Sequence, residues 1–217
     1  MDKQYIANRA KEELYKLYPE ALCALEWGGG DENGWKLVVM GRLSAQCTDE
    51  RVNIVCKELF SRFSTAKALA DANIEDIEEI VRPCGLYHTK AADIKSECYD
   101  ITYKHNGKVP DTMEELLEMR GVGRKIANLL LGDLYKKGGI VADTHCIRIC
   151  GRLGMYDEGI KDPLKVEKIM SEYIPLEEQS DFCHRIVQFG RDICIARSPK
   201  CEECPMRDFC AHLNPLN

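Results

Sequence analysis

The stretch "LLEMRGVGRKIANLLLGDLY", residues 116–135, contains two apolar segments at helical spacing, joined by a short turn with two glycines. We predict that one helix ends near Met119 and that the next runs from about Arg124 to Leu134. Gly121 and Gly123 permit positive φ and leave backbone N–H groups uncovered. Such a turn at the start of a helix is typical of an anion nest suited to a phosphate. Similar turns also join helices in proteins that bind nothing, so the turn alone leaves both interpretations open.

Helical periodicity extends over the rest of the chain. Thr48 is expected to be the N-cap of a helix that has acidic residues in its first turn. Thr112 and Glu115 have the spacing of a capping box. Strand signals are nearly absent, since the β-branched stretch 138–144 is short. The pattern predicts an all-α fold with short connections, from apolar stripes in these segments: 6–17, 34–46, 48–63, 72–83, 89–107 and 110–119.

Composition limits the class of protein. A hydrophobic content of 45% with 30% charged residues is ordinary for a globular chain of 217 residues. The first 22 residues are charged throughout and lack the apolar run of a signal peptide, and no stretch is apolar enough to span a membrane. We therefore expect a cytoplasmic protein without a membrane partner.

Twelve cysteines are present, and a disulfide framework is not expected in a reducing compartment. Eight are scattered through apolar patterns and are interpreted as buried free thiols. The other four lie in "CIARSPKCEECPMRDFC", residues 194–210, with the spacing C-x6-C-x2-C-x5-C. An all-sulfur site binds zinc or an iron–sulfur cluster, and the uneven gaps favour a cubane cluster. The predicted metal ligands are Cys194, Cys201, Cys204 and Cys210.

Several blocks together resemble the endonuclease III family, helix-hairpin-helix DNA glycosylases that carry a 4Fe-4S cluster. The resemblance covers roughly residues 5–212. The sequence departs from the family pattern by lacking Leu-Pro before the hairpin and Thr after the lysine, by Gly41 and Arg42 in an apolar helix, and by the glycine-rich lead-in 26–35. The blocks are "LSAQCTD" (43–49), "GLYHTKA" (85–91), "HNGKVP" (105–110), "RGVGRKIAN" (120–128), "VADTHCIRICGR" (141–152) and the cysteine tail.

The resemblance implies two helical domains flanking a DNA-binding cleft. A six-helix domain, residues 27–137, would carry the helix-hairpin-helix motif. Residues 1–26 and 138–217 would form the second domain, which carries the 4Fe-4S cluster loop. Double-stranded DNA containing damaged pyrimidines or abasic sites is the implied partner, bound by a monomer that would be nucleoid-associated in a bacterium.

The resemblance also implies catalytic roles. Lys125 matches the family's nucleophile, which attacks the sugar as a neutral amine and forms a Schiff base. Asp143 matches the catalytic carboxylate that stabilises the sugar cation as the glycosidic bond breaks. The alternatives are a solvated lysine in a first helical turn and an aspartate that caps a helix.

Further positions match the family's DNA contacts. Gln46 and Leu86 correspond to residues that enter the duplex, for which a helix cap and a core leucine are the alternatives. His145 either contacts a phosphate or closes a turn. The expected backbone contacts are the hairpin residues Arg120, Gly121, Val122, Gly123 and Arg124, and the cysteine-loop cations Arg197 and Lys200.

A net charge of −6 is unfavourable for DNA binding. The charge is unevenly distributed, however: residues 119–153 hold seven Lys/Arg and two Asp, which gives +5 and leaves −11 for the remainder. We predict that the basic segment faces DNA and that the acids lie on solvated helix faces.

The predicted function is a base-excision-repair DNA glycosylase with AP lyase activity on oxidised pyrimidines. The alternatives are a non-catalytic DNA-binding module with a structural metal site and a mismatch-specific glycosylase of the same superfamily.

Overall fold

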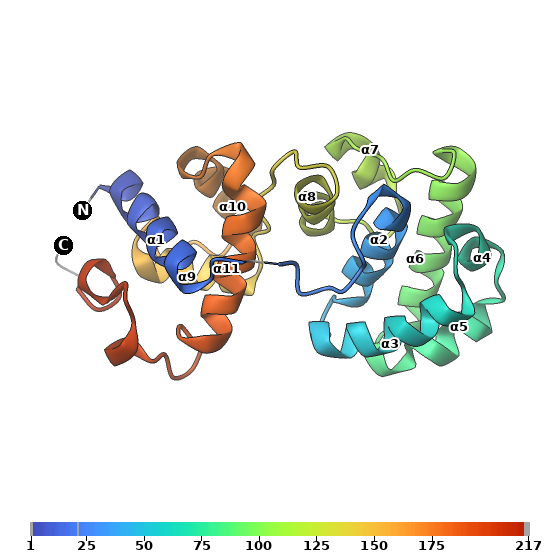
Figure 1. Cartoon of the computed structure of the whole chain (residues 1–217), viewed down its shortest axis with the longest axis horizontal. Coiled ribbons are helices and arrows are strands. Elements are labelled where there is room, and N and C mark those ends of the chain that lie inside the picture. The colour runs from blue at the N-terminus through green and yellow to red at the C-terminus, as the bar shows by residue number, and fades with distance from the viewer. Residues whose placement is uncertain (1, 21, 215–217) are drawn as a thin grey trace. The chain divides into compact units, whose positions relative to one another are not determined.

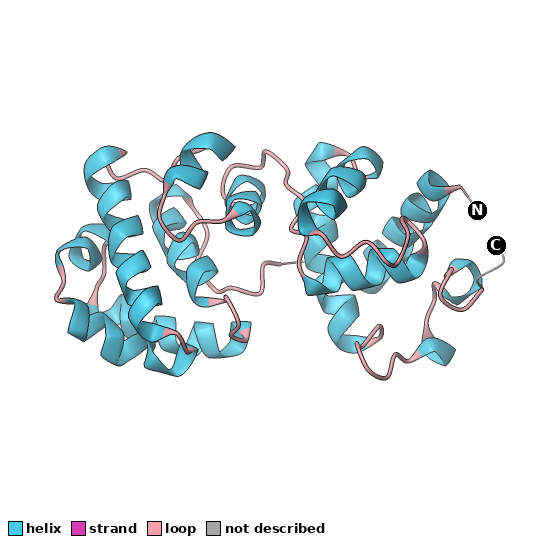
Figure 2. Cartoon of the chain, turned by 180° about the vertical axis from the view of Figure 1, so that it is seen from behind, coloured by secondary structure: helices cyan, strands magenta, loops and turns pink. Residues whose placement is uncertain are grey.

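The structure is a computed structural model, and it describes residues 2–20 and 22–214. Within these residues every regular element is a helix, and none is a strand (Figure 2). The prediction of an all-α fold is therefore confirmed. None of the helices in this part of the chain is long and apolar enough to cross a membrane.

The chain forms two compact units, each with its own apolar core. One unit is continuous, Cys23–Lys136, and the other combines Met1–Leu22 with Lys137–Asn217. The domain boundaries expected from the family resemblance, 27–137 against 1–26 with 138–217, stay a prediction.

The continuous unit is arranged around α6, which packs against α2, α4 and α5 (Figure 1). Its core is mostly aliphatic, and the helices build it by turning apolar stripes inward. Two 3-10 turns, η1 (Asp31–Asn33) and η2 (Arg82–Cys84), precede α2 and α6, and a π-helical turn, η3 (Asp100–Lys104), extends α6. The α-helices are α2 (Gly34–Leu43), α3 (Asp49–Arg62), α4 (Ala66–Asp71), α5 (Ile74–Val81), α6 (Tyr87–Tyr99), α7 (Met113–Glu118) and α8 (Arg124–Asp133).

Helix ends follow the capping residues of the sequence. The Thr48 hydroxyl accepts a hydrogen bond from the Arg51 amide at 3.4 Å, and the Thr112 hydroxyl accepts one from the Glu115 amide at 3.3 Å. These bonds satisfy amides that the first helical turn leaves unpaired. Both predicted N-caps are therefore present.

Gly41, one of the departures from the family pattern, lets α2 approach α8. A Cβ atom at this position would lie 3.2 Å from the Ile126 methyl group, which is closer than an ordinary contact. Because Gly41 is buried, a larger residue would push the two helices apart. The glycine therefore has a packing reason within this unit.

The second unit contains α1 (Lys3–Leu17), α9 (Thr144–Leu153), α10 (Pro163–Tyr173) and α11 (Gln179–Asp192). In this unit α11 packs against α1 and α9 (Figure 1). Short 3-10 turns follow α10 and build the cysteine loop: η4 (Leu176–Glu178), η5 (Cys201–Glu203) and η6 (Arg207–Phe209). Met206 and Phe209 from this loop are buried in the core of the unit, so the loop is part of its packing.

Candidate functional site

The hairpin turn between α7 and α8 rests on α6. Gly121 has φ +87°, and a Cβ atom there would lie 2.8 Å from Glu97 Oε1 and 2.9 Å from Asp93 Cβ. Only glycine combines this left-handed conformation with such close contact. Gly123 differs from the prediction, because its φ of −93° is ordinary extended backbone. It is the N-cap of α8, and a Cβ atom there would meet nothing within 4 Å.

Two backbone amides in this turn, those of Gly121 and Gly123, have no hydrogen-bond partner in the described part of the chain. Val122 between them is different. Its side chain is 5% exposed and its amide donates to Met119 O at 3.1 Å. The predicted DNA contact by Val122 is therefore not supported by this geometry, because the side chain packs in the core and the amide is already bonded.

Arg42 on α2, which departs from the family pattern, and Arg120 in the turn meet at one carboxylate of α6. Asp93 Oδ2 accepts a hydrogen bond from Arg42 Nε at 2.8 Å and forms an ion pair with Arg42 Nη2 at 2.8 Å, and Asp93 Oδ1 accepts from Arg120 Nε at 2.7 Å. The Asp93 side chain is 7% exposed and that of Arg120 is 61% exposed. Arg120 is thus fixed at its Nε while its outer part remains at the surface.

Glu97, one helical turn after Asp93, is fully buried beneath Gly121. Neither carboxyl oxygen has a hydrogen-bond partner within the described residues. Burial raises the pKa of Glu97 well above its ordinary value, Asp93 and Asp100 add to this, and Arg42 opposes it. The buried site therefore favours the protonated, neutral form of Glu97.

Lys125 is the second residue of α8, directly after Arg124, and both side chains are exposed. No hydrogen bond or ion pair joins the Lys125 ammonium to another described residue. A lysine at this position can reach a bound molecule without first breaking an internal contact.

Gln46 and Leu86 share an unusual backbone conformation. Their φ angles are +56° and +48°, in the left-handed region that side chains other than glycine rarely adopt. Leu86 is 60% exposed, so the alternative of a core leucine is wrong. Gln46 is also exposed and lies three residues beyond the end of α2, so it does not cap that helix directly. Strained, exposed positions of this kind are concentrated at binding sites.

Lys90 of α6 was missed by the sequence reasoning, although it lies in the block 85–91. Its Nζ donates to the carbonyl oxygens of Leu43, Ala45 and Cys84, which lie beside Gln46 and Leu86. No local signal marks such a lysine, because its partners are supplied by other segments.

In the second unit, Asp143 is the N-cap of α9, where its Oδ1 accepts from the Cys146 amide at 2.7 Å. Asp143 therefore caps a helix, as the alternative interpretation proposed. Its Oδ2 has no hydrogen-bond partner among the described residues, so the cap uses only half of the carboxylate.

His145 is half-buried, and its Nδ1 lies 3.2 Å from Arg148 Nη2. A Cβ atom on Gly190 of α11 would collide with this ring at 2.3 Å, so His145 packs tightly between the two helices.

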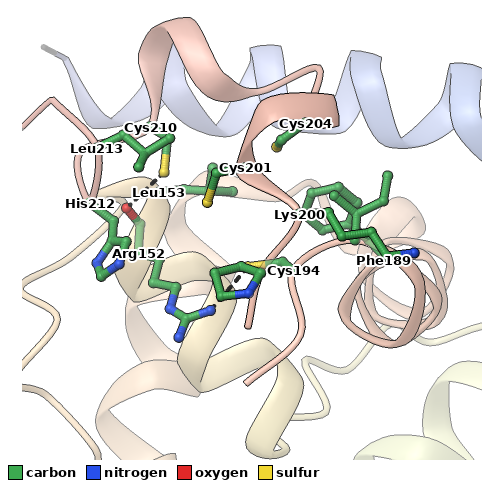
Figure 3. A pocket seen from close by; sticks show the side chains of 12 residues that line it. Arg152, Leu153, Phe189, Cys194, Lys200, Cys201, Cys204, Cys210, His212 and Leu213 are labelled. Carbon is green, nitrogen blue, oxygen red and sulfur yellow. Dashed lines mark hydrogen bonds between the residues drawn. The ribbon is translucent and has the colours of Figure 1, made fainter. Parts of the chain in front are cut away.

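The four predicted ligands line one pocket at the surface of this unit. Cys194, Cys201, Cys204 and Cys210 surround about 380 Å³ of space that is partly open to solvent, with Arg152 and Phe189 in its wall (Figure 3). Burial raises the pKa of the Cys204 and Cys210 thiols, and repulsion from the neighbouring cysteines adds to it. Four thiolates at this density need a cationic centre to balance their charge.

The spacing of these sulfurs discriminates between zinc and a cluster. In a tetrahedral zinc site, Zn–S bonds of about 2.3 Å place the sulfurs about 3.8 Å apart. Among the described residues, no three of these sulfurs lie within 4.8 Å of one another. The pocket therefore fits a larger centre with four separate corners better than a single ion, which agrees with a cubane cluster.

Two arginines of α9, counted in the sequence only as part of the basic segment, anchor the start of the cysteine loop. Arg148 donates to Cys194 O at 3.0 Å. Arg152 donates to Ala196 O at 2.9 Å, to Ile195 O at 3.1 Å and to Cys194 Sγ at 3.4 Å. Their i, i+4 spacing could have indicated a shared partner. Arg197 and Lys200 are exposed, and neither forms an ion pair within the described residues.

Comparison with known proteins gives two family matches. Residues 39–176 match the HhH-GPD superfamily of base excision DNA repair proteins, and residues 194–210 match the iron–sulfur binding domain of endonuclease III. Endonuclease III of Synechocystis sp. is 39% identical, over 91% of this chain and 88% of the relative.

Solved structures give the same result. The protein in a non-covalent endonuclease III–DNA complex has a TM-score of 0.90 and 36% identity, covering 99% of this chain and 98% of that one. A trapped endonuclease III–DNA covalent intermediate matches with the same TM-score, identity and coverage.

Proposed function

The chain belongs to the endonuclease III family of base excision DNA repair proteins, and we propose that it removes oxidised pyrimidines from duplex DNA through a Schiff base on Lys125. The enzyme is a DNA glycosylase with AP lyase activity, and it carries a 4Fe-4S cluster. One observation carries the proposal: Lys125 is exposed in the first turn of α8, directly after a turn with two unpaired amides.

Phosphate binding begins at the hairpin. The amides of Gly121 and Gly123 have no acceptor among residues 2–20 and 22–214, and the start of α8 adds the positive end of a helix dipole. The guanidinium of Arg120, fixed at Nε by Asp93, supplies a cation beside them. We expect Arg124 and the loop cations Arg197 and Lys200 to contact further phosphates, so binding falls steeply with salt despite the net charge of −6.

Base removal requires the nucleotide to leave the stack, because C1′ is otherwise inaccessible. Gln46 and Leu86 fill the vacated space and wedge the opposite strand. The neutral amine of Lys125 donates its electron pair to C1′, and the base leaves with the electrons of the glycosidic bond and takes up a proton. The Asp143 carboxylate stabilises the positive charge that develops on the sugar, using the Oδ2 that the helix cap leaves unbonded.

The nitrogen electron pair then opens the sugar ring: the C1′–O4′ bond breaks, its electrons go to O4′, which takes up a proton released from the nitrogen, and the C1′=N bond of the Schiff base forms. Strand cleavage follows from the Schiff base. Loss of a C2′ proton allows the C3′–O bond to break, and the phosphate leaves with that electron pair. Water then hydrolyses the imine, which releases an unsaturated aldehyde and restores the lysine amine. Cys194, Cys201, Cys204 and Cys210 would hold the cluster, which would fix this loop when bound, and the chain's own residues carry every reacting step.

Borohydride trapping tests the nucleophile. Borohydride added during turnover on a thymine glycol duplex should reduce the Schiff base and leave a covalent protein–DNA adduct. Lys125→Gln should abolish the adduct and strand cleavage while retaining DNA binding, because the hairpin amides are unchanged. Lys108→Gln, another exposed lysine of the same unit, is the matched control and should behave as wild type. An adduct at wild-type level in Lys125→Gln would show that another amine is the nucleophile.

Asp143→Asn separates the second role. It should slow excision of the base but still form the adduct on a preformed abasic site, where the glycosidic bond is already absent. Equal losses on both substrates would contradict a role in bond cleavage.

Comparison of a thymine glycol duplex with a thymine–guanine mismatch tests the lesion class, for which we propose oxidised pyrimidines. We propose further that the enzyme acts as a monomer on chromosomal DNA in the cytoplasm.

A further inference from the structure

Lys90 is a fully buried lysine in the middle of the continuous unit, and it has no carboxylate partner within the described residues. Its side chain is 0% exposed. The ammonium donates to three main-chain carbonyl oxygens, Leu43 O at 2.9 Å, Ala45 O at 2.8 Å and Cys84 O at 2.8 Å. An ammonium has three donors, so each has one acceptor.

The ends of two helical elements supply this site. Leu43 is the last residue of α2, and Cys84 is the last residue of η2. Terminal carbonyls lack partners within their own helix and carry its negative dipole end, which explains how a buried cation is stabilised without a carboxylate. Burial raises the pKa of the Cys84 thiol to about 12, and the nearby Cys47 adds to this. That thiol is therefore neutral at physiological pH and does not compete for the ammonium.

The same carbonyls flank the two residues with left-handed backbone. Ala45 directly precedes Gln46, and Cys84 lies two residues before Leu86. The backbone amide of Lys90 also donates to Leu86 O at 3.0 Å. Left-handed backbone at residues other than glycine persists only where the surroundings fix it, and here one side chain contacts both segments.

We propose that Lys90 is a positioning residue that locks the loops of Gln46 and Leu86 in a single arrangement, so that both side chains enter the duplex together. The inference rests on the proposed function of Gln46 and Leu86. Because one ammonium fixes both loops before DNA binds, the conformational entropy of ordering them is not lost during base extrusion. The effect is greatest where a paired base must be extruded and smallest where no base has to be removed.

Lys90→Met tests this, because it replaces the lysine by an unbranched side chain only one heavy atom shorter and removes the three donors. Excision is measured on three substrates: thymine glycol paired with adenine, thymine glycol in an unpaired bubble, and a preformed abasic site. Fluorescence of 2-aminopurine beside the lesion reports unstacking independently of chemistry. We expect the paired-to-bubble ratio of excision rates to fall on the order of tenfold or more, with a smaller fluorescence increase and near-normal cleavage of the abasic site.

Lys95→Met is the matched control on the same helix. Lys95 Nζ donates to Ala70 O at 2.7 Å and Ala72 O at 2.6 Å, at the end of α4, which contains no proposed DNA contact. The control should lower the melting temperature but leave the paired-to-bubble ratio unchanged. If both lysine variants change the ratio equally, or neither does, Lys90 has only a structural role and the proposal is overturned.

Gln46→Ala and Leu86→Ala distinguish failure of this inference from failure of the proposed function. If these two variants leave the ratio unchanged, the proposed roles of Gln46 and Leu86 are wrong. If they lower it and Lys90→Met does not, only the inference about Lys90 is wrong. The double variant Lys90→Met/Leu86→Ala should show less than the product of the two single effects, since both changes act on one step.

Lys90→Gln is the milder variant, because its amide keeps two N–H donors, and it should give an intermediate ratio. Failure of both Lys90 variants to fold at low temperature would overturn the proposal, since Lys90 would then be required by the whole unit rather than by its two loops.

Discussion

The hairpin turn 119–123 and the cysteine loop 194–210 are both irregular backbone at the surface of their units, but they are fixed by different interactions. The hairpin turn rests on α6, where Gly121 packs over Asp93 and Glu97 and Arg120 is bonded to Asp93. The cysteine loop has two short 3-10 turns, and arginines of α9 bond its first residues. Its four sulfurs surround the cluster pocket.

The difference concerns where the stabilising free energy originates. The hairpin turn depends on side chains that are present as soon as the unit folds. The cysteine loop depends on a metal centre, without which four thiols share one small pocket. Loss of the cluster should therefore lower the stability of the unit that carries the cysteine loop. Loss of the ion pairs at Asp93 should lower the stability of the continuous unit. Three predictions examine this division.

The largest effect is expected from removal of a cluster ligand. Cys201→Ser should abolish iron binding and lower the stability of the protein by more than about 5 kcal/mol, because the free energy of metal binding is also folding free energy. Met206 and Phe209 would lose their fixed place in the core of that unit. Iron analysis and thermal melting measure this. Cys23→Ser, at a half-buried cysteine outside the loop, should retain the iron. A stable, iron-free Cys201→Ser protein would mean that the loop, like the hairpin, is fixed by protein contacts alone.

A smaller loss is expected at the hairpin. Asp93→Asn should lower the free energy of unfolding by about 3 kcal/mol, since it leaves the mostly buried Arg42 without a carboxylate. It should also weaken DNA binding, because Arg120 is no longer fixed, while the iron content stays normal. Urea denaturation and binding titrations measure the two effects. Asp76→Asn breaks the exposed pair with Arg62 and should cost less than about 1 kcal/mol. Equal losses from the two variants would show that the Asp93 network does not support the turn.

The third effect is a dependence on pH, and it is the smallest when it is counted per pH unit. Burial raises the pKa of Glu97 well above its ordinary value of 4.5, so above that pH there is a range in which the folded protein keeps a proton that the unfolded chain has released. The stability from this protonated acid is complete below about pH 4.5 and is lost as pH rises toward the folded value, by at most about 1.4 kcal/mol per pH unit. Glu97→Gln removes that loss. It should be more stable than wild type at pH 8 and the difference should shrink toward pH 5, as measured by urea denaturation at each pH. A difference independent of pH would mean that Glu97 is ionised in the folded protein.

Several features could be predicted from the sequence because they depend on neighbours along the chain. Apolar residues at helical spacing and the capping residues Thr48 and Thr112 indicate helices by local rules, and the all-α fold is confirmed. The four cysteines lie within seventeen residues, so a short loop can place them around one centre, and the iron–sulfur domain is confirmed. The family was likewise identified from short blocks in the right order. The roles of Lys125 and Asp143 remain a proposal.

Other features were decided only by the tertiary structure, because their partners are far apart along the chain. Arg42 and Arg120 are 51 and 27 residues from Asp93, and no spacing rule joins them. Two of the three carbonyls that bind Lys90 are 47 and 45 residues away. A buried charge requires acceptors whose positions are set by the packing of α2 against α6, and the amino-acid sequence specifies that packing only through the whole core. Local pattern therefore determines the helices and the metal ligands, whereas the packed core determines which charges meet beneath the hairpin.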